Sequence, residues 1–298
     1  MKIIRGLSKI TKRLTANVAT LGVFDGVHLG HQAILKETLR QARKSGIKSL
    51  CVTFWPNPKK SPLLYSLEHR LDLIERIGFD ICLVVNFSKS FSLLNPESFI
   101  KNILIGKLNT KQLIIGNGFR FGRGKCADAE TLIGYSNKYG FKVKEIELLK
   151  IGNHNISSTR IRDFISRGRL LDAEGLLGRP VAVYGTVKRG LKFAGKLGFP
   201  TANINPHHEV LPPNGIYAVN VIFNNNSYPG VCYIGTRPSL NLKELVVEVH
   251  IFDFSGNIYE RDIYIEFKKF IRKEAKFKNF SLLKFRIKKD LKTAKSLF

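Results

Sequence analysis

The fold is decided by one stretch near the N-terminus, which reads Leu21-Gly22-Val23-Phe24-Asp25-Gly26-Val27-His28-Leu29-Gly30-His31-Gln32. The uncharged segment from Thr15 to Phe24 predicts a strand, and the dipeptide Asp25-Gly26 predicts a turn after it. Apolar residues at helical spacing then predict a helix over about 29–44. A strand, a glycine turn and a helix N-terminus can form a phosphate site, because the first helical N–H groups lack intrahelical partners and the dipole is positive there.

Two histidines in this stretch are candidate catalytic residues. His28 and His31 are three positions apart, so both lie on one face of the first helical turn. Two imidazoles at a helix N-terminus could donate hydrogen bonds to a triphosphate and to its leaving group. An ordinary pair of surface or core histidines has the same spacing, but the complete H-x-G-H element favours the phosphate site. A zinc site is not expected, because the four cysteines are scattered and form no C-x-x-C pair.

Composition narrows the class of protein. The 298 residues suffice for one large domain or two ordinary ones, and an apolar fraction of 44% predicts a packed core. No apolar run approaches the roughly 20 residues that span a bilayer, and the basic N-terminus lacks the apolar segment of a secretory signal. The cysteines have no framework spacing, which is typical of a reducing compartment. We therefore expect a cytoplasmic protein that does not bind membranes.

The net charge of +26 favours anionic ligands. Phosphorylated small molecules and nucleic acid would both be attracted, and a nucleic-acid role is the less expected of the two. Lysine and arginine are densest after residue 268, where interspersed apolar residues predict a docked amphipathic helix from about Phe280 with a solvated basic face.

Strands and helices alternate through the first half of the chain. We expect strands at 49–54, 81–85, 112–116 and 141–146, and helices at 67–77, from about Asn95 and from about Asp128. This alternation predicts a parallel sheet covered by helices, with ligands beyond the carboxyl ends of the strands, where 24–31, 56–58 and 116–124 fall. Ser158, Thr159 and Arg160 open a further helix and could bind phosphate oxygens, although a serine cap with a solvated basic turn has the same pattern.

The pattern changes near residue 178. Short strands at 182–187, 216–223, 230–234, 245–254 and 258–267 are separated by turn residues, which predicts an antiparallel barrel closed by the C-terminal helix. We therefore expect two domains, residues 1–178 and 179–298.

A second chemical centre is predicted early in this barrel. A glycine-punctuated loop leads to Thr201 and Asn203, which share one side of an extended segment. Their oxygens suit a Mg²⁺ ion that bridges ATP phosphates. Glu248, among apolar neighbours, is a candidate general base. Outward polar residues on a strand and a structural glutamate at the barrel edge remain open alternatives.

These residues resemble the bacterial bifunctional riboflavin kinase/FAD synthetases over essentially the whole chain. The resemblance is carried by Gly22–His31, Ser158–Arg160, Gly198–Asn203, Gly215–Ala218, Gly235–Pro238 and Glu248–His250. Phe-Pro-Thr-Ala-Asn is specific to riboflavin kinases, whereas H-x-G-H is shared with other nucleotidylyltransferases and class I aminoacyl-tRNA synthetases. The resemblance implies an N-terminal Rossmann-like nucleotidylyltransferase domain, followed by a riboflavin-kinase-type antiparallel β-barrel with a C-terminal helix.

The resemblance also implies two successive reactions and their site residues. In the barrel, Mg²⁺ and ATP convert riboflavin to FMN, with Thr201 and Asn203 holding the metal and Glu248 taking the hydroxyl proton. In the N-terminal domain, ATP adenylylates FMN to FAD, with His28 and His31 neutralising charge. The implied ATP or phosphate contacts are Gly22, Phe24, Asp25, Gly26, Gly30, Ser158, Thr159, Arg160, Gly190, Lys196, Gly198 and Pro200. The implied flavin contacts are Asn57, Asn117, Phe119, Arg120 and Phe121.

Three positions depart from the family pattern. Asn57 replaces the histidine of Pro-His-Pro, Gly118 replaces an acidic or amide residue that Asn117 could supply, and Ala194 replaces a loop glycine. A riboflavin kinase with a degenerate nucleotide-binding N-terminal domain is therefore one alternative. A basic nucleic-acid-binding protein is a second alternative, from another class. The sequence does not predict the oligomeric state.

Overall fold

The computed structural model describes residues 1–58, 63–147, 149–152, 154–190, 195, 198–207, 210–237 and 245–298. The chain forms two compact units. One contains residues 1–63 and 67–158, and the other contains residues 64–66 and 159–298. Among the described residues, no helix is long and apolar enough to cross a bilayer.

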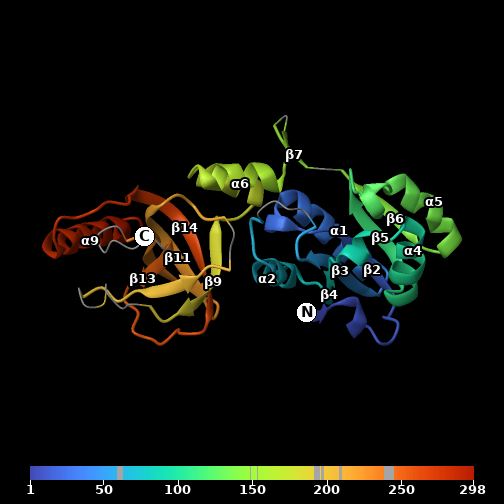
Figure 1. The fold of residues 1–298 in the computed structure, drawn as a ribbon, viewed down its shortest axis with the longest axis horizontal. Helices are drawn as coiled ribbons and strands as arrows, with labels where there is room; N and C mark the ends of the chain where they lie inside the picture. Colours follow the sequence, from blue (N-terminus) through green and yellow to red (C-terminus); the bar gives the residue numbers. More distant parts are fainter. Residues whose placement is uncertain are drawn as a thin grey trace. The chain divides into compact units, whose positions relative to one another are not determined.

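The first unit is built on a parallel six-stranded sheet, which confirms the predicted architecture (Figure 1). In spatial order its strands are β1 (Lys2–Arg5), β4 (Ile81–Asn86), β3 (Lys48–Trp55), β2 (Asn17–Leu21), β5 (Thr110–Gly116) and β6 (Lys142–Ile146). The strand predicted over 15–24 is shorter in the structure, Asn17–Leu21, and the turn that follows contains Phe24 with a left-handed φ of 51°. The edge strand β1 was not predicted, since only Ile4 of its four residues is buried.

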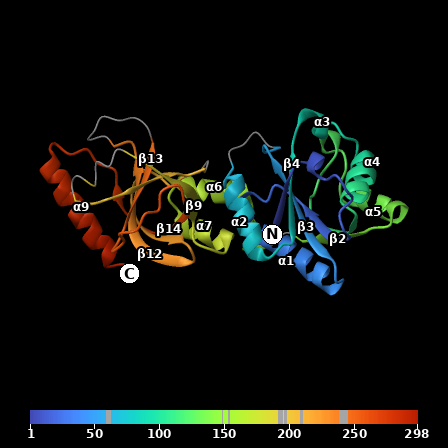
Figure 2. The ribbon, with the colours of Figure 1, turned by 90° about the horizontal axis from the view of Figure 1, so that it is seen from below.

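Helices cover both faces of this sheet (Figure 2). The first face is covered by α1 (Leu29–Lys44), whose Ile34 and Ala42 pack with Val18 and Ile114. Among the described residues of the first unit, the α- and π-helical segments include α1, α2 (Leu67–Ile77), α3 (Lys89–Ser92), α4 (Pro96–Ser98), the π-helix η3 (Phe99–Lys107) and α5 (Ala129–Tyr139). The other face packs against η3 and α5 in one large apolar core. Side chains alternate between faces along each strand, so both layers are needed to bury them.

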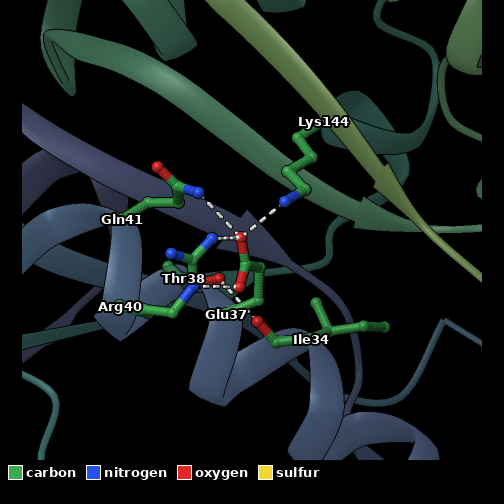
Figure 3. Close-up of polar contacts among 6 residues, drawn as sticks. All are labelled: Ile34, Glu37, Thr38, Arg40, Gln41 and Lys144. Carbon is green, nitrogen blue, oxygen red and sulfur yellow. Dashed lines mark hydrogen bonds and ion pairs between the residues drawn. The ribbon is translucent and has the colours of Figure 1, made fainter. Parts of the chain in front are cut away.

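A cluster centred on Glu37 joins α1 to the edge strand β6 (Figure 3). The Glu37 carboxylate accepts hydrogen bonds from Arg40 and Gln41 of its own helix and from Lys144 of β6, at 2.7 to 2.8 Å. The Arg40 guanidinium, together with Gln41 and Lys144, holds the pKa of Glu37 well below its usual range, although burial acts in the opposite direction. Ionised Glu37 therefore stabilises the contact between helix and strand.

The second unit is a closed antiparallel barrel, as predicted. Its strands follow one another around the barrel as β10 (Ala202–Asn205), β13 (Val246–Ile251), β12 (Asn226–Gly235), β11 (Gly215–Phe223), β14 (Asp262–Lys273) and β9 (Ala182–Lys188). Along β13, Val247, Val249 and Ile251 are buried while Glu248 and His250 are partly exposed. The period of two therefore places Glu248 on the outer face of the barrel.

The helices with bounds inside the described part of this unit, or next to it, include α6 (Ser158–Ser166), α7 (Leu170–Leu177) and α9 (Phe280–Lys295). The barrel closes by pairing of β9 with β10, whereas α9 lies outside it, with Ala294 in a small apolar cluster that includes residues of β11 and β12. Arg272 of β14 binds the buried Asp290 of α9 at 2.7 Å. Phe285 of α9 is 69% exposed, so the docked face is narrower than the sequence predicts.

Candidate active sites

The turn after β2 is tightly folded and mostly buried. Phe24, Gly26 and Val27 have φ angles of 51°, 77° and 39°, and they lead the chain from the sheet into α1. The Phe24 ring lies against Gly22, where a Cβ would be 2.9 Å from it. The Ser158 hydroxyl donates a hydrogen bond to the Asp25 carbonyl oxygen at 3.0 Å. Ser158 therefore supports the turn through its hydroxyl.

The two predicted histidines meet at the start of α1. His28 caps the helix, because its Nδ1 accepts a hydrogen bond from the His31 N–H at 3.3 Å. The two imidazole rings stack with centroids 3.6 Å apart and planes 18° apart. A nitrogen that accepts carries no proton, so the proton of the His28 ring is on Nε2. A Cβ at Gly30 would lie 3.3 Å from this ring, which explains the small residue there.

Arg70 is a further charged residue of this site that the sequence did not reveal. Its side chain is 0% exposed and donates to the Val23 carbonyl oxygen and to Thr53 Oγ1, at the carboxyl ends of β2 and β3. Burial lowers the pKa of Arg70, while the Asp25 carboxylate acts to raise it. The signal was its place at helical spacing among Leu67, Leu71 and Ile74, where an apolar residue is expected.

A row of phenylalanine rings runs from near the carboxyl ends of β3 and β4 into the apolar core beside the sheet. Phe119 and Phe121, the two aromatic residues among the predicted flavin contacts, stack with centroids 5.8 Å apart. Ring contacts at 5.7 to 6.2 Å extend this row through Phe99, Phe91, Phe87 and Phe54. The last four were not predicted as ligand contacts, although Phe54 and Phe87 stand near strand ends, where ligands are expected.

The other predicted flavin contacts are more exposed. Arg120 forms an ion pair with Asp128 at 3.1 Å. Asn117 and Gly118 are exposed, and Asn57 is half-buried. Gly118 has φ 77° and no atom within 4 Å of the place where a Cβ would be. Gly, Asn and Asp all tolerate this conformation, so the turn is compatible with either residue type.

The barrel site is organised by strand register. Asn203 of β10 lies directly across from Glu248 of β13, and Glu248 lies directly across from Tyr233 of β12. Directly opposed residues of antiparallel strands project to the same side of the sheet. Two candidates that are 45 positions apart in sequence are therefore neighbours on the outer face of the barrel.

The loop before β10 shapes the place of Asn203. A Cβ at Gly190 would lie 2.0 Å from Asn203 Nδ2, so only glycine leaves room for this side chain. His250 Nδ1 donates to the Pro200 carbonyl oxygen at 2.7 Å. Thr201 lines a pocket of about 280 Å³ with residues that include Val187, Phe254 and Tyr259.

The remaining predicted loop residues differ in how far they can be placed. Gly198, at φ 94°, precedes Thr201 by three residues, and its N–H donates a hydrogen bond to the Gly195 carbonyl oxygen at 3.0 Å. Lys196 lies outside the described residues.

Arg237 also reaches this site and was not assigned a role from the sequence. Its Nη2 donates to Asn203 Oδ1 at 2.8 Å and to Glu248 Oε1. The carbonyl oxygen of the asparagine and one carboxylate oxygen therefore converge on a single cationic nitrogen.

Comparison with known proteins gives matches along the whole chain. Residues 10–160 match the family model for FAD synthetase, and residues 177–298 match the model for riboflavin kinase. A protein of Buchnera aphidicola subsp. Schizaphis graminum, named bifunctional riboflavin kinase/FMN adenylyltransferase, is 40% identical over 100% of this chain and 99% of its own. The protein of that name from Escherichia coli K12 is 35% identical over 100% of this chain and 98% of its own.

A solved structure has the same fold across both units. A crystal structure titled macrolide-efflux protein from Streptococcus pneumoniae superposes with a TM-score of 0.81 and 28% identity, covering 97% of each chain. With family models matched in both halves and full-length relatives at 35 to 40% identity, the chain belongs to the family of bifunctional riboflavin kinase/FMN adenylyltransferases.

Proposed function

We propose that this chain phosphorylates riboflavin to FMN in the barrel and adenylylates FMN to FAD in the parallel-sheet unit. The observation that carries the proposal is the meeting of Asn203 and Glu248 across β10 and β13, within the segment that matches the riboflavin kinase model. The two activities are assigned to residues 179–298 and 1–178, respectively.

In the barrel, Glu248 takes the proton of the ribityl 5′-hydroxyl as this oxygen attacks the γ-phosphorus of ATP, and the bond from that phosphorus to ADP breaks. Asn203 and Thr201 would hold Mg²⁺. Their oxygen atoms are ligands that this ion prefers. Asn203 Oδ1 and Glu248 Oε1 both accept hydrogen bonds from one cationic nitrogen, Nη2 of Arg237. When bound, the ion would supply positive charge to the ATP phosphates. Gly190 contributes by leaving room for the Asn203 side chain.

In the parallel-sheet unit, the N-terminus of α1 receives phosphate groups between Gly26 and Gly30. An FMN phosphate oxygen forms a bond to the α-phosphorus of ATP, and the bond from that phosphorus to pyrophosphate breaks. His28 and His31 donate hydrogen bonds to the charge that develops there. The resemblance adds Thr159 and Arg160, in the first turn of α6, as further phosphate contacts.

The flavin ring system is proposed to lie against the row of phenylalanines. Flat aromatic surfaces suit an isoalloxazine, which is itself a flat aromatic system. Phe119 and Phe121 are the proposed stacking residues, with Asn57, Asn117 and Arg120 as polar neighbours. The stacked pair, with centroids 5.8 Å apart, supports this placement.

The proposed substrates are riboflavin, FMN and ATP, of which FMN and ATP are phosphorylated anions that a positively charged chain attracts. We propose that the enzyme works in the cytoplasm. All four cysteines are free, which supports a reducing compartment.

The experiment is chromatography of the products formed from riboflavin, ATP and Mg²⁺. FAD as the end product is expected, and no conversion of riboflavin would refute the proposal. Asn203→Ala is expected to abolish FMN formation while added FMN is still converted to FAD. His28→Ala, as the matched variant in the other unit, is expected to have the reverse effect. Loss of both activities in either variant would refute separate sites.

A riboflavin kinase without adenylyltransferase activity is the second candidate. The exposed Gly118, which offers no side chain where the family has an acid or an amide, favours it. FMN that accumulates, with added FMN also unconverted, would establish this alternative.

A further inference from the structure

Arg237 bridges the two residues to which the proposed function assigns the kinase chemistry. One guanidinium nitrogen, Nη2, donates to Asn203 Oδ1 at 2.8 Å and to Glu248 Oε1. The side chains of Arg237 and Glu248 are only 13% and 17% exposed, so water screens their attraction weakly. The guanidinium therefore stands at the point where two acceptor oxygens converge.

The backbone of Arg237 is held independently of its side chain. Its φ of 53° is uncommon for a residue with a Cβ, and its N–H donates to Tyr233 Oη at 2.6 Å. The Tyr233 hydroxyl donates to Glu274 Oε1, which also accepts from the Thr236 N–H at 2.9 Å. Burial, and then the bond to Glu274, raises the pKa of Tyr233, so its hydroxyl keeps the proton that it donates. A movement of Arg237 away from Asn203 and Glu248 therefore involves its side chain and not its backbone.

We propose that Arg237 acts as a cation surrogate, which holds Asn203 and Glu248 in the ligand-free barrel and leaves them when a divalent cation arrives with the nucleotide. This inference rests on the proposed roles of Asn203 and Glu248. In the proposed function Asn203 Oδ1 is a ligand of the cation, and the guanidinium binds the same oxygen in the ligand-free barrel, so each excludes the other there. Until the cation binds, Arg237 compensates the mostly buried Glu248 carboxylate, which is unfavourable in the absence of a positive charge.

The test measures binding rather than turnover. Mn²⁺ is titrated into the full chain with ADP, and free Mn²⁺ is followed by electron paramagnetic resonance. The barrel site is defined as the binding that Asn203→Ala removes. At that site, the Arg237→Met variant is expected to bind Mn²⁺ about tenfold more tightly. A guanidinium that occupies the site about nine-tenths of the time leaves about one-tenth of the molecules competent to bind the cation, which lowers the apparent affinity by that factor.

The outcomes separate the inference from the proposed function. If Arg237→Met leaves the Mn²⁺ affinity unchanged, Arg237 does not compete with the cation and the inference is overturned. Weaker Mn²⁺ binding also overturns it, and would indicate that the guanidinium binds the nucleotide phosphates instead. If Asn203→Ala removes no Mn²⁺ binding, the proposed metal role of Asn203 fails together with the inference. If that variant removes one site and Arg237→Met leaves the affinity of this site unchanged, only the inference fails.

Two further variants control for charge and for folding. Arg261 is an exposed arginine of the same unit, so Arg261→Met removes the same positive charge away from Asn203 and Glu248. This variant is expected to leave the Mn²⁺ affinity of the barrel site unchanged. Arg237→Lys keeps the charge but cannot present the planar fork, and is expected to tighten binding at least about twofold even if Arg237→Met does not fold.

Discussion

Gly190→Ala tests whether the place of Asn203 sets the rate of FMN formation. The new Cβ would lie 2.0 Å from Asn203 Nδ2 and 2.3 Å from its Cγ, whereas real Cβ contacts essentially never fall below 3.0 Å. The amide must therefore move by about 1 Å. A displacement of about 1 Å in a positioning group costs about 10²-fold in rate, so we expect riboflavin phosphorylation to fall by about that factor. Crowding should also reduce stability by about 1–3 kcal/mol.

The assay is chromatography of FMN formed from riboflavin at saturating ATP and Mg²⁺, with conversion of added FMN to FAD as the internal control. Gly175→Ala is the matched variant, because this helical glycine in α7 has no atom within 4 Å of a new Cβ. It should leave both rates unchanged and raise stability by about 0.5–1 kcal/mol. Phosphorylation within threefold of the parent in a folded Gly190→Ala variant would refute the reasoning.

Three further predictions concern the parallel-sheet unit. Glu37→Gln should lower the free energy of unfolding at neutral pH by about 1–2 kcal/mol, measured with urea, because it removes the charge that Arg40 and Lys144 contact. The pKa of Glu37 is lowered in the folded state, so this difference should be complete above the ordinary value of 4.5 and should shrink as the pH falls below it; a constant difference would contradict the assignment. His28→Ala should reduce FAD formation from FMN by at least about 10²-fold, and a smaller loss would exclude electrostatic stabilisation by this ring. Gly118→Asn should raise the rate of FAD formation, since the turn tolerates Asn and the space is open; an unchanged rate would indicate that no side-chain contact is missing there.

Local patterns predicted the elements well where the governing interactions are local. The helix expected at 67–77 has those bounds in the structure. Asn95, where another helix was expected to begin, caps it by accepting a hydrogen bond from the Ser98 N–H at 2.7 Å. Asp128 likewise caps α5. Capping and helical periodicity depend on neighbours within one turn, so the sequence contains the information directly.

The sequence was a poor guide where burial and charge oppose each other. Arginine in a helix is usually exposed to solvent, so the sequence indicates an exposed Arg70. Only the packing of α2 near the ends of β2 and β3 reveals it as a fully buried hydrogen-bond donor. Phe285 illustrates the reverse case, since an apolar residue at helical spacing is 69% exposed. Periodicity identifies which residues share a face but does not identify what covers that face.

By itself, the sequence determined the parallel and antiparallel architectures, the family, and the residue types at both sites, because strand periodicity, turn residues and short motifs are properties of neighbouring positions. Tertiary structure decided which of these residues meet. The register of β10 against β13 places Asn203 opposite Glu248, and the fold then brings Arg237 onto both. Register depends on pairing between distant segments, and a shift by one residue would turn each side chain to the other face of the sheet.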